Sequence, residues 1–157
     1  MSETLQATAT GSTDILFVRD FHASPALVWR ALTEPALLTV WLWARDIPMT
    51  TCQMDLRVGG AFRWVWTRPD GTDMGVSGRF LEIDAPHLLV NTEVFDDDWT
   101  SGETTVKQHL TLIDEHHTRL RIVVRYSTAA ARDLALASPM TEGMEDAYGK
   151  LDTLLRD

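Results

Sequence analysis

The chain of 157 residues is 45% hydrophobic and 24% charged, and it is long enough to bury a core as one globular domain. Its net charge of −9, from 23 acidic and 14 basic residues, argues against nucleic acid and anionic membrane surfaces as partners, because both need clustered lysine or arginine. The single cysteine, Cys52, excludes an internal disulfide, and no apolar run approaches the roughly 20 residues of a membrane-spanning helix, so we expect a cytoplasmic protein.

The chain begins with a segment that carries no strong structural signal. Residues 1–13 lack the basic start and the apolar stretch of a secretion signal, and we expect them to form a short flexible tail. One domain then extends over residues 14–157, since no linker, repeat or low-complexity tract interrupts it. Its first element, residues 14–23 (DILFVRDFHA), is rich in Ile, Phe and Val and is typical of a strand.

Two short helices are predicted after this strand. Ser24 is a suitable N-cap, and Pro25 suits the first helical position, where no N–H donor is needed. The chain repeats the device with Thr33 as a cap and Pro35 in the first turn of a second helix. The two helices should therefore meet near Thr33.

Alternating side chains then indicate a series of strands. In GGAFRWVWT (59–67), a period of two puts Phe62, Trp64 and Trp66 on one face. The PDG turn leads into a strand at 72–83, where Met74 and Phe80 share a face. The glycines of this strand, Gly75 and Gly78, indicate bulges or a close approach of backbone.

Three further strands are predicted at 87–95, 104–113 and 118–126, and the last has the clearest alternation. From Met140, apolar residues at spacings of three and four predict one long amphipathic helix. The order of elements indicates an α+β fold, in which an antiparallel sheet of six to seven strands curls around the final helix. The outer face of the last strand carries Arg119, Arg121 and Arg125.

Three segments carry a resemblance to a known family: SPALVWRALTEPALLTVW (24–41), DLRVGGAFRW (55–64) and the stretch from DGT to DAPHLLV (70–90). From about Asp14 to Leu155 the chain resembles the SRPBCC, or START-like, superfamily, and within it the homologues of the activator of the heat-shock chaperone ATPase. The resemblance implies a helix-grip fold, with a cavity between a curved sheet and a long C-terminal helix. Members of the superfamily bind lipids, hormones or polyketides, and some are cyclases or hydratases.

The sequence departs from this branch at two inward positions. Glu93 stands where a bulky aromatic residue is usual, and Asn91 stands where an apolar or aromatic residue is common. If the intervening loop closes a hairpin with Phe95 opposite Thr104, Asn91 falls opposite Gln108. The side-chain amides of Asn91 and Gln108 then either hydrogen-bond to each other or are available to bind a ligand.

Glu93 is the candidate for chemistry. A carboxylate that faces an apolar cavity has a raised pKa and can act as a general acid or base. Pairing with an arginine and a place at the wet mouth of the pocket are the alternatives. Aromatic and methionine side chains would supply an apolar wall. The predicted ligand-binding residues are Phe62, Trp64, Trp66, Met74, Phe80, Asn91, Glu93, Gln108, Met144 and Tyr148.

Other polar groups carry weaker signals. His116 and His117 sit in a turn and lack metal-ligand geometry, so we expect them to be solvated. Asp96, Asp97 and Asp98 lack the alternating oxygen ligands and the glycine of a calcium loop. The chain has no nucleophile elbow and no nucleotide-binding glycine pattern. We therefore predict no cofactor and no metal.

Three functions are compatible with these features. The first is binding of a small hydrophobic or aromatic molecule in an internal cavity. The second is a cyclase- or hydratase-type enzyme that uses Glu93 with Asn91 and Gln108, and the third is a chaperone-interaction module, with a chaperone or a second copy of the chain as partner. A ligand-sized cavity that reaches Glu93 would favour binding or catalysis, whereas sealed aromatics and an exposed apolar surface would favour the module.

Overall fold

The computed structural model describes residues 3–156, in which eight strands and four helices form. The strands are β1 (Gln6–Thr10), β2 (Asp14–Phe21), β3 (Met49–Met54), β4 (Ala61–Thr67), β5 (Asp73–Asp84), β6 (Leu88–Phe95), β7 (Thr104–Asp114) and β8 (His117–Arg125). The helices are α1 (Pro25–Thr33), α2 (Pro35–Trp41), α3 (Ala129–Ala137) and α4 (Met140–Arg156).

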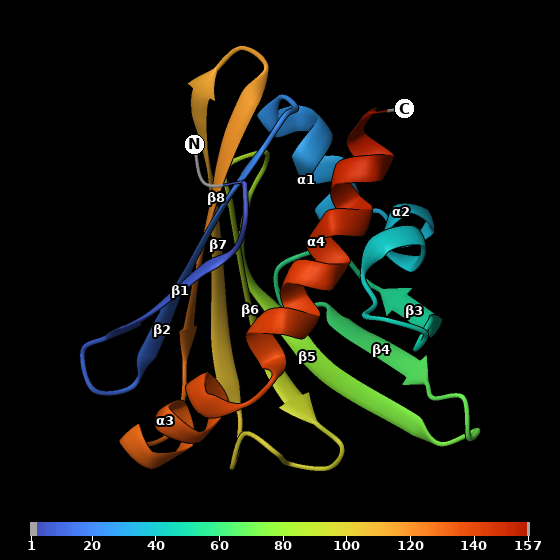
Figure 1. The fold of residues 1–157 in the computed structure, drawn as a ribbon, viewed down its shortest axis with the longest axis vertical. Helices are drawn as coiled ribbons and strands as arrows, with labels where there is room; N and C mark the ends of the chain where they lie inside the picture. Colours follow the sequence, from blue (N-terminus) through green and yellow to red (C-terminus); the bar gives the residue numbers. More distant parts are fainter. Residues whose placement is uncertain (1–2, 157) are drawn as a thin grey trace.

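The strands form one antiparallel sheet in the order β1-β2-β8-β7-β6-β5-β4-β3. The sheet is curved and open, and the long helix α4 lies across its inner face, with α1 and α2 beside it (Figure 1). This arrangement is the helix-grip fold that the sequence predicts. The sheet has eight strands, however, rather than six to seven.

The two strands that the sequence did not reveal are the edges of the sheet, β1 and β3. The prediction of a flexible tail is wrong for β1, which pairs with β2 from Gln6 opposite Val18 to Thr10 opposite Asp14. Both edge segments, QATAT and MTTCQM, are dominated by small and polar side chains, so they show no apolar alternation and depend on backbone pairing with a neighbour. The part of the tail at residues 1–2 lies outside the described residues.

The helices α1 and α2 begin at prolines, as predicted. The Ser24 hydroxyl accepts a hydrogen bond from the backbone N–H of Leu27 (3.4 Å), which caps α1. Thr33 does not cap α2, because it is still in α1 and its hydroxyl donates to the Trp29 carbonyl (2.7 Å). Glu34 is the cap residue instead, with the extended backbone (φ −93°, ψ 120°) favoured before a proline.

The main core lies between α4 and the half of the sheet that contains β2, β7 and β8. Tyr148 of α4 is at its centre, stacked on Trp41 of α2 and edge-on to Phe21 of β2, each at 5.6 Å between ring centroids. Leu151 and Ile15 are fully buried beside them. Aromatic contacts of this kind fix α4 against both the sheet and α2.

A buried ion-pair cluster also joins α4 to the sheet. Arg19 points inward from β2 between buried phenylalanines, and it is only 2% exposed. Its guanidinium donates to both carboxylates of the facing helix side, Glu145 at 3.0 Å and Asp152 at 2.8 Å. The outward arginines Arg119 and Arg125 pair with Asp20 and Asp14 on the opposite face of the sheet.

A second, smaller core lies under β4, β5 and β6. It contains Phe62, Val76, Phe80 and Leu89, all at most 3% exposed. A Cβ on Gly78 would lie 1.9 Å from the Thr92 carbonyl oxygen and 2.4 Å from the Phe62 ring. The close backbone approach predicted for Gly78 is therefore present, and the missing side chain leaves room for the Phe62 ring.

Candidate functional site

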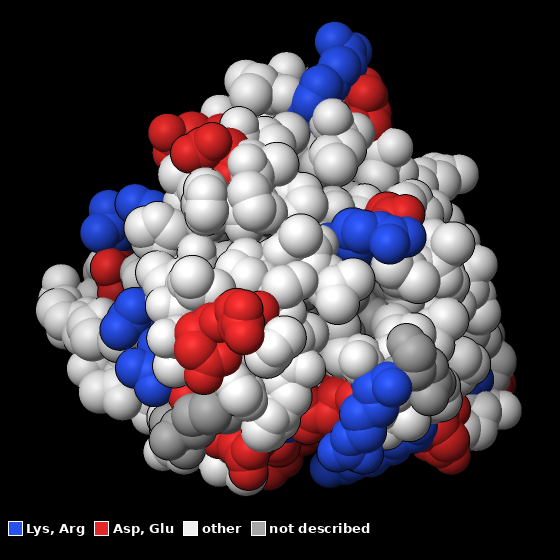
Figure 2. All heavy atoms as spheres, turned by 90° about the horizontal axis from the view of Figure 1, so that it is seen from above, with Lys and Arg blue, Asp and Glu red and all other residues white. Residues whose placement is uncertain are grey.

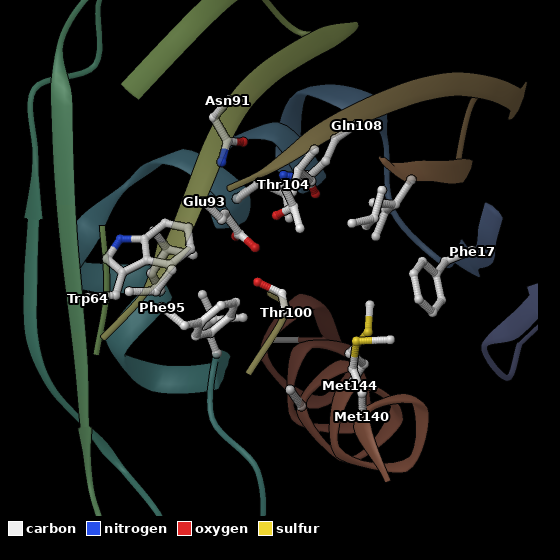
Figure 3. Close-up of a pocket in the computed structure, with 18 of the residues that line it drawn as sticks. Phe17, Trp64, Asn91, Glu93, Phe95, Thr100, Thr104, Gln108, Met140 and Met144 are labelled. Atoms are coloured by element: carbon white, nitrogen blue, oxygen red, sulfur yellow. The ribbon is translucent and has the colours of Figure 1, made fainter. Parts of the chain in front are cut away.

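A cavity of about 240 Å³ lies between the inner face of the sheet and α4. Its wall combines residues of helices α1, α2 and α4 and of strands β2, β4, β5, β6, β7 and β8, so it is built from segments distant in the sequence (Figure 3). Most of the wall is apolar, and the aromatic side chains are Phe17, Trp41, Trp64, Trp66, Phe95, Trp99, Tyr126 and Tyr148. Trp99 is an exposed member of this wall in the loop between β6 and β7, and its ring centroid lies 5.3 Å from that of Phe95.

Seven of the ten predicted ligand-binding residues line this cavity: Trp64, Trp66, Asn91, Glu93, Gln108, Met144 and Tyr148. Three do not. Phe62 and Phe80 pack against each other in the second core, with 5.4 Å between ring centroids, and they fill that end of the inner face. Met74 lies opposite Trp66 near the β4–β5 turn and does not reach the cavity.

The hairpin register differs from the prediction by two residues. Thr104 lies opposite Glu93 rather than Phe95, and Val106, not Gln108, lies opposite Asn91. The loop before β7 is longer than a tight hairpin turn and contains residues with positive φ, including Asp98 at 49°. A shift of two residues keeps every side chain on its predicted face, so the cavity-lining residues are unaffected.

Glu93 is the central polar group of the cavity. Its carboxylate points into the open space toward Thr100 and Thr104 (Figure 3), and within residues 3–156 it makes no hydrogen bond or ion pair. Desolvation by burial raises the pKa of Glu93 to about 7. The side chain is nevertheless partly accessible, because the cavity itself admits solvent. The expected alternative of pairing with an arginine does not occur in the described chain.

Two threonines, neither of them among the residues predicted from the sequence, complete the polar part of the wall. Thr104 is 2% exposed, and its hydroxyl has no hydrogen-bond partner within residues 3–156. The Thr100 hydroxyl donates to the Gly102 carbonyl at 2.8 Å, so only its lone pairs are available to the cavity. Alternation with Val106 could have identified Thr104, whereas Thr100 is in an irregular loop that carries no such signal.

The amides that were expected to pair with each other are separate. The side-chain nitrogen of Asn91 donates to the Thr92 carbonyl at 3.1 Å, and Asn91 is 3% exposed. Gln108 also lines the cavity, and its side chain forms no hydrogen bond in the described part of the chain. Gln108 is therefore the amide with spare donors and acceptors.

The two tyrosines of the wall stay neutral near pH 7. Burial, together with the charge of Glu93, raises the pKa of Tyr126 to about 12, and the Tyr126 hydroxyl donates to the Met140 sulfur at 3.7 Å. Burial likewise raises the pKa of Tyr148. Glu93 is thus the group in the wall that changes charge between acidic and neutral pH.

The histidines lie at the far end of β8 and form a contact that the sequence did not predict. His117 is not a solvated turn residue: one ring nitrogen contacts Asp114 at 2.7 Å and the other contacts His22 at 3.1 Å. His116 is exposed, as expected. Among residues 3–156, no group of three or more His, Cys, Asp or Glu side chains is arranged to hold a metal ion.

The face of the protein seen from above carries mixed charge. Figure 2 shows that arginine and lysine side chains on this face lie next to acidic ones rather than in one continuous patch. Within residues 3–156, the helices are either too short or too polar to cross a membrane.

Comparison with known proteins places this fold in a defined group. The family model described as Activator of Hsp90 ATPase homolog 1-like protein matches residues 22–156. The chain is similar to a crystal structure from Rhodobacter sphaeroides, with 41% identity over 98% of both chains and a TM-score of 0.92. A Nitrosomonas europaea structure has 27% identity over 94% of this chain and 97% of its own, with a TM-score of 0.82.

A more distant structure shares the fold alone. An Hsp90 activator from Plasmodium falciparum is 21% identical over 91% of this chain and 96% of its own, with a TM-score of 0.64. No curated protein matches the sequence.

Proposed function

Because the chain belongs to the family of Activator of Hsp90 ATPase homolog 1-like proteins, we propose that it binds a small, mostly apolar molecule between the sheet and α4. The observation that carries this proposal is the aromatic-walled cavity of about 240 Å³ that reaches Glu93. An apolar cavity of roughly 150 Å³ already admits benzene. The larger space here suits a ligand with about two fused rings.

Binding of a neutral fluorescent probe, N-phenyl-1-naphthylamine, tests this proposal. We expect a dissociation constant in the micromolar range, which corresponds to a binding free energy of about −8 kcal/mol. Trp64→Ala removes part of the cavity wall and should weaken binding at least about tenfold, on the order of 1.4 kcal/mol. The control is Trp43→Ala, because Trp43 lies outside the cavity, where its ring contacts Lys150 at 4.3 Å.

Equal binding by both tryptophan variants would place the probe elsewhere and remove the support for the cavity. Native mass spectrometry of freshly purified protein complements the titration. A retained small molecule that is lost in Trp64→Ala but kept in Trp43→Ala would identify the natural ligand by mass.

An enzyme of the cyclase or hydratase type is the second candidate. The observation that favours it is that burial raises the pKa of Glu93 to about 7, a value suited to a general acid or base near neutral pH. Glu93→Gln keeps the shape of the side chain and removes its ionisation. In an enzyme this change abolishes turnover of the bound ligand, while affinity for it stays within a few fold.

The chaperone-interaction alternative is supported by family membership. Its test is direct: the protein either raises the ATPase rate of a purified heat-shock chaperone of the ninety-kilodalton class or leaves it unchanged. Stimulation that survives Trp64→Ala would assign the activity to the outer surface rather than to the cavity. Cytoplasmic localisation and self-association stay predictions.

A further inference from the structure

The charge of the cavity wall has one sign. The lining residues with ionisable side chains, within residues 3–156, are Glu93, Tyr126 and Tyr148, and both tyrosines are neutral near pH 7. No lysine or arginine contributes to the wall. An ionised Glu93 therefore faces the ligand space with no protein cation to balance it.

The nearest buried cation does not supply that balance. Arg19 acts electrostatically on Tyr148 of the wall, but its guanidinium is already held by two carboxylates, Glu145 and Asp152. This cluster has a net charge of −1 when its members are ionised. Arg19 is therefore not available to pair with Glu93.

Hydrogen-bond acceptors lie close to the Glu93 carboxylate at one end of the cavity. In Figure 3 the oxygens of Glu93, Thr100 and Thr104 point toward one another across the end of the cavity. The Thr104 hydroxyl is buried and without a partner, and the Thr100 hydroxyl has committed its hydrogen to Gly102. A group with several N–H donors and a positive charge would satisfy all three oxygens at once.

Aromatic rings lie on one side of this acceptor cluster. The ring of Trp64 lies beside Glu93 and Phe95 (Figure 3), and it meets Trp66 edge-to-face at 6.4 Å between centroids. Aromatic faces attract cations in desolvated sites. The large rings of the wall can therefore contact the apolar body of a ligand, and the carboxylate and hydroxyl oxygens can bind its cationic end.

We propose that the ligand of this cavity is an organic ammonium ion, a primary amine on an aromatic or apolar body, with its nitrogen held by Glu93, Thr100 and Thr104. The inference rests on the proposed ligand-binding function and adds the charge class of the ligand. It also excludes apolar carboxylates, since a second carboxylate next to Glu93 would meet a like charge in a desolvated site.

Three naphthyl compounds of similar size test the charge class by isothermal titration calorimetry. They are 2-(1-naphthyl)ethylamine, 2-(1-naphthyl)ethanol and the anion of 1-naphthaleneacetic acid, which are cationic, neutral and anionic, respectively, at neutral pH. At about pH 8.5 the amine should bind at least about tenfold more tightly than the alcohol, a difference of ~1.4 kcal/mol. The acetate should be the weakest of the three.

The pH dependence provides a second readout. The ammonium group stays protonated up to about pH 10, as lysine does, so Glu93 governs the change below that value. Since burial raises the pKa of Glu93 to about 7 and the ionised form is the competent one, amine affinity should rise about 30-fold from about pH 5.5 to about pH 8.5. Tyr126, Tyr148 and Arg19 keep their charge over this range, because the pKa of each is raised, and alcohol binding should stay within about threefold.

Glu93→Gln should remove both the preference for the amine and its pH dependence, while the alcohol still binds and shows that the variant is folded. Thr104→Val should weaken the amine but not the alcohol. If the amine binds no better than the alcohol, or keeps its preference in Glu93→Gln, the ammonium proposal is wrong and ligand binding stands. If none of the three compounds binds at millimolar concentration, the ligand-binding function is itself overturned.

Discussion

Two charged side chains point to the inner face of the sheet, and their surroundings are opposite. Arg19 on β2 is 2% exposed and donates four hydrogen bonds to Glu145 and Asp152 of α4. The carboxylate of Glu93 on β6 has no hydrogen bond or ion pair within residues 3–156 and faces an open cavity. The charge of Arg19 holds α4 to the sheet, whereas the charge of Glu93 is available to a ligand.

The comparison shows what distinguishes a structural polar group from a functional one. A buried charge with a full set of partners stabilises a fixed geometry, and removing one partner leaves the others unsatisfied. A buried charge without partners reduces the free energy of unfolding, and removing it should raise stability at the expense of binding. Substitutions in the two regions should therefore change stability in opposite directions.

The largest effect is expected for Arg19→Met. This change keeps much of the apolar side chain but leaves Glu145 and Asp152 facing each other without a cation. Both carboxylates are partly exposed, at 33% and 24%, so we expect a loss of about 3 kcal/mol in the free energy of unfolding, at the low end for broken buried pairs. Urea denaturation near neutral pH measures it.

The matched control is Arg125→Met, which breaks a surface pair with Asp14. Arg125 is 69% exposed, and exposed pairs contribute at most about 1 kcal/mol. Equal losses in the two variants would mean that the Arg19 cluster does not hold α4 in place.

Glu93→Gln should have the opposite sign and a smaller size. Burial raises the pKa of Glu93 from 4.5 to about 7, so the folded state binds the proton more tightly than the unfolded state does. Stability from this group is therefore fully present below about pH 4.5 and is lost as the pH rises through about 7. Because solvent reaches Glu93 through the cavity, we expect the variant to gain about 1–3 kcal/mol at about pH 8.5 and to change little at about pH 4.5.

Unfolding free energies of the parent and Glu93→Gln over this pH range check the sign. The parent should lose stability relative to the variant between about pH 4.5 and pH 8. A constant difference across the range would mean that Glu93 titrates as an ordinary surface carboxyl, and the case for a functional charge would fail.

Alternation in the sequence predicted the faces of the sheet well. It placed Trp64, Glu93 and Gln108 inward, and all three line the cavity even though the hairpin register was off by two residues. Strict alternation would also have placed Arg19 inward between Phe17 and Phe21. Its partners were harder to find, because Glu145 and Asp152 are recognisable only once α4 is seen to cross β2.

Alternation does not predict where inward side chains fill the interior and where they leave a cavity. Phe62 and Trp64 occupy equivalent inward positions two residues apart, yet Phe62 packs closely against Gly78 and Trp64 borders the cavity. That difference depends on sheet curvature and on how far α4 lies from each strand. Edge strands are a second limit, because β1 is held by its pairing with β2 and not by apolar side chains of its own.

The smallest change in the free energy of unfolding is expected at Thr104, which we compare with a second buried threonine, Thr118. The Thr104 hydroxyl has no partner in the described chain, whereas Thr118, which is 0% exposed, donates to the Ala23 carbonyl at 2.7 Å. Valine has nearly the same shape as threonine, so each substitution removes only the hydroxyl group. We expect Thr104→Val to raise the free energy of unfolding by about 0.5–1 kcal/mol, since it removes an unsatisfied polar atom from a buried site.

Thr118→Val is the control and should lower the free energy of unfolding by about 1–2 kcal/mol, because it leaves a buried carbonyl without its donor. Both values are measured by urea denaturation without ligand. A loss in Thr104→Val as large as that in Thr118→Val would show that the Thr104 hydroxyl is already satisfied, for example by a bound water, and would take it out of the proposed ammonium site. A gain in Thr104→Val together with weaker binding of 2-(1-naphthyl)ethylamine would instead mark the hydroxyl as a group that the free protein leaves unpaired and the ligand uses.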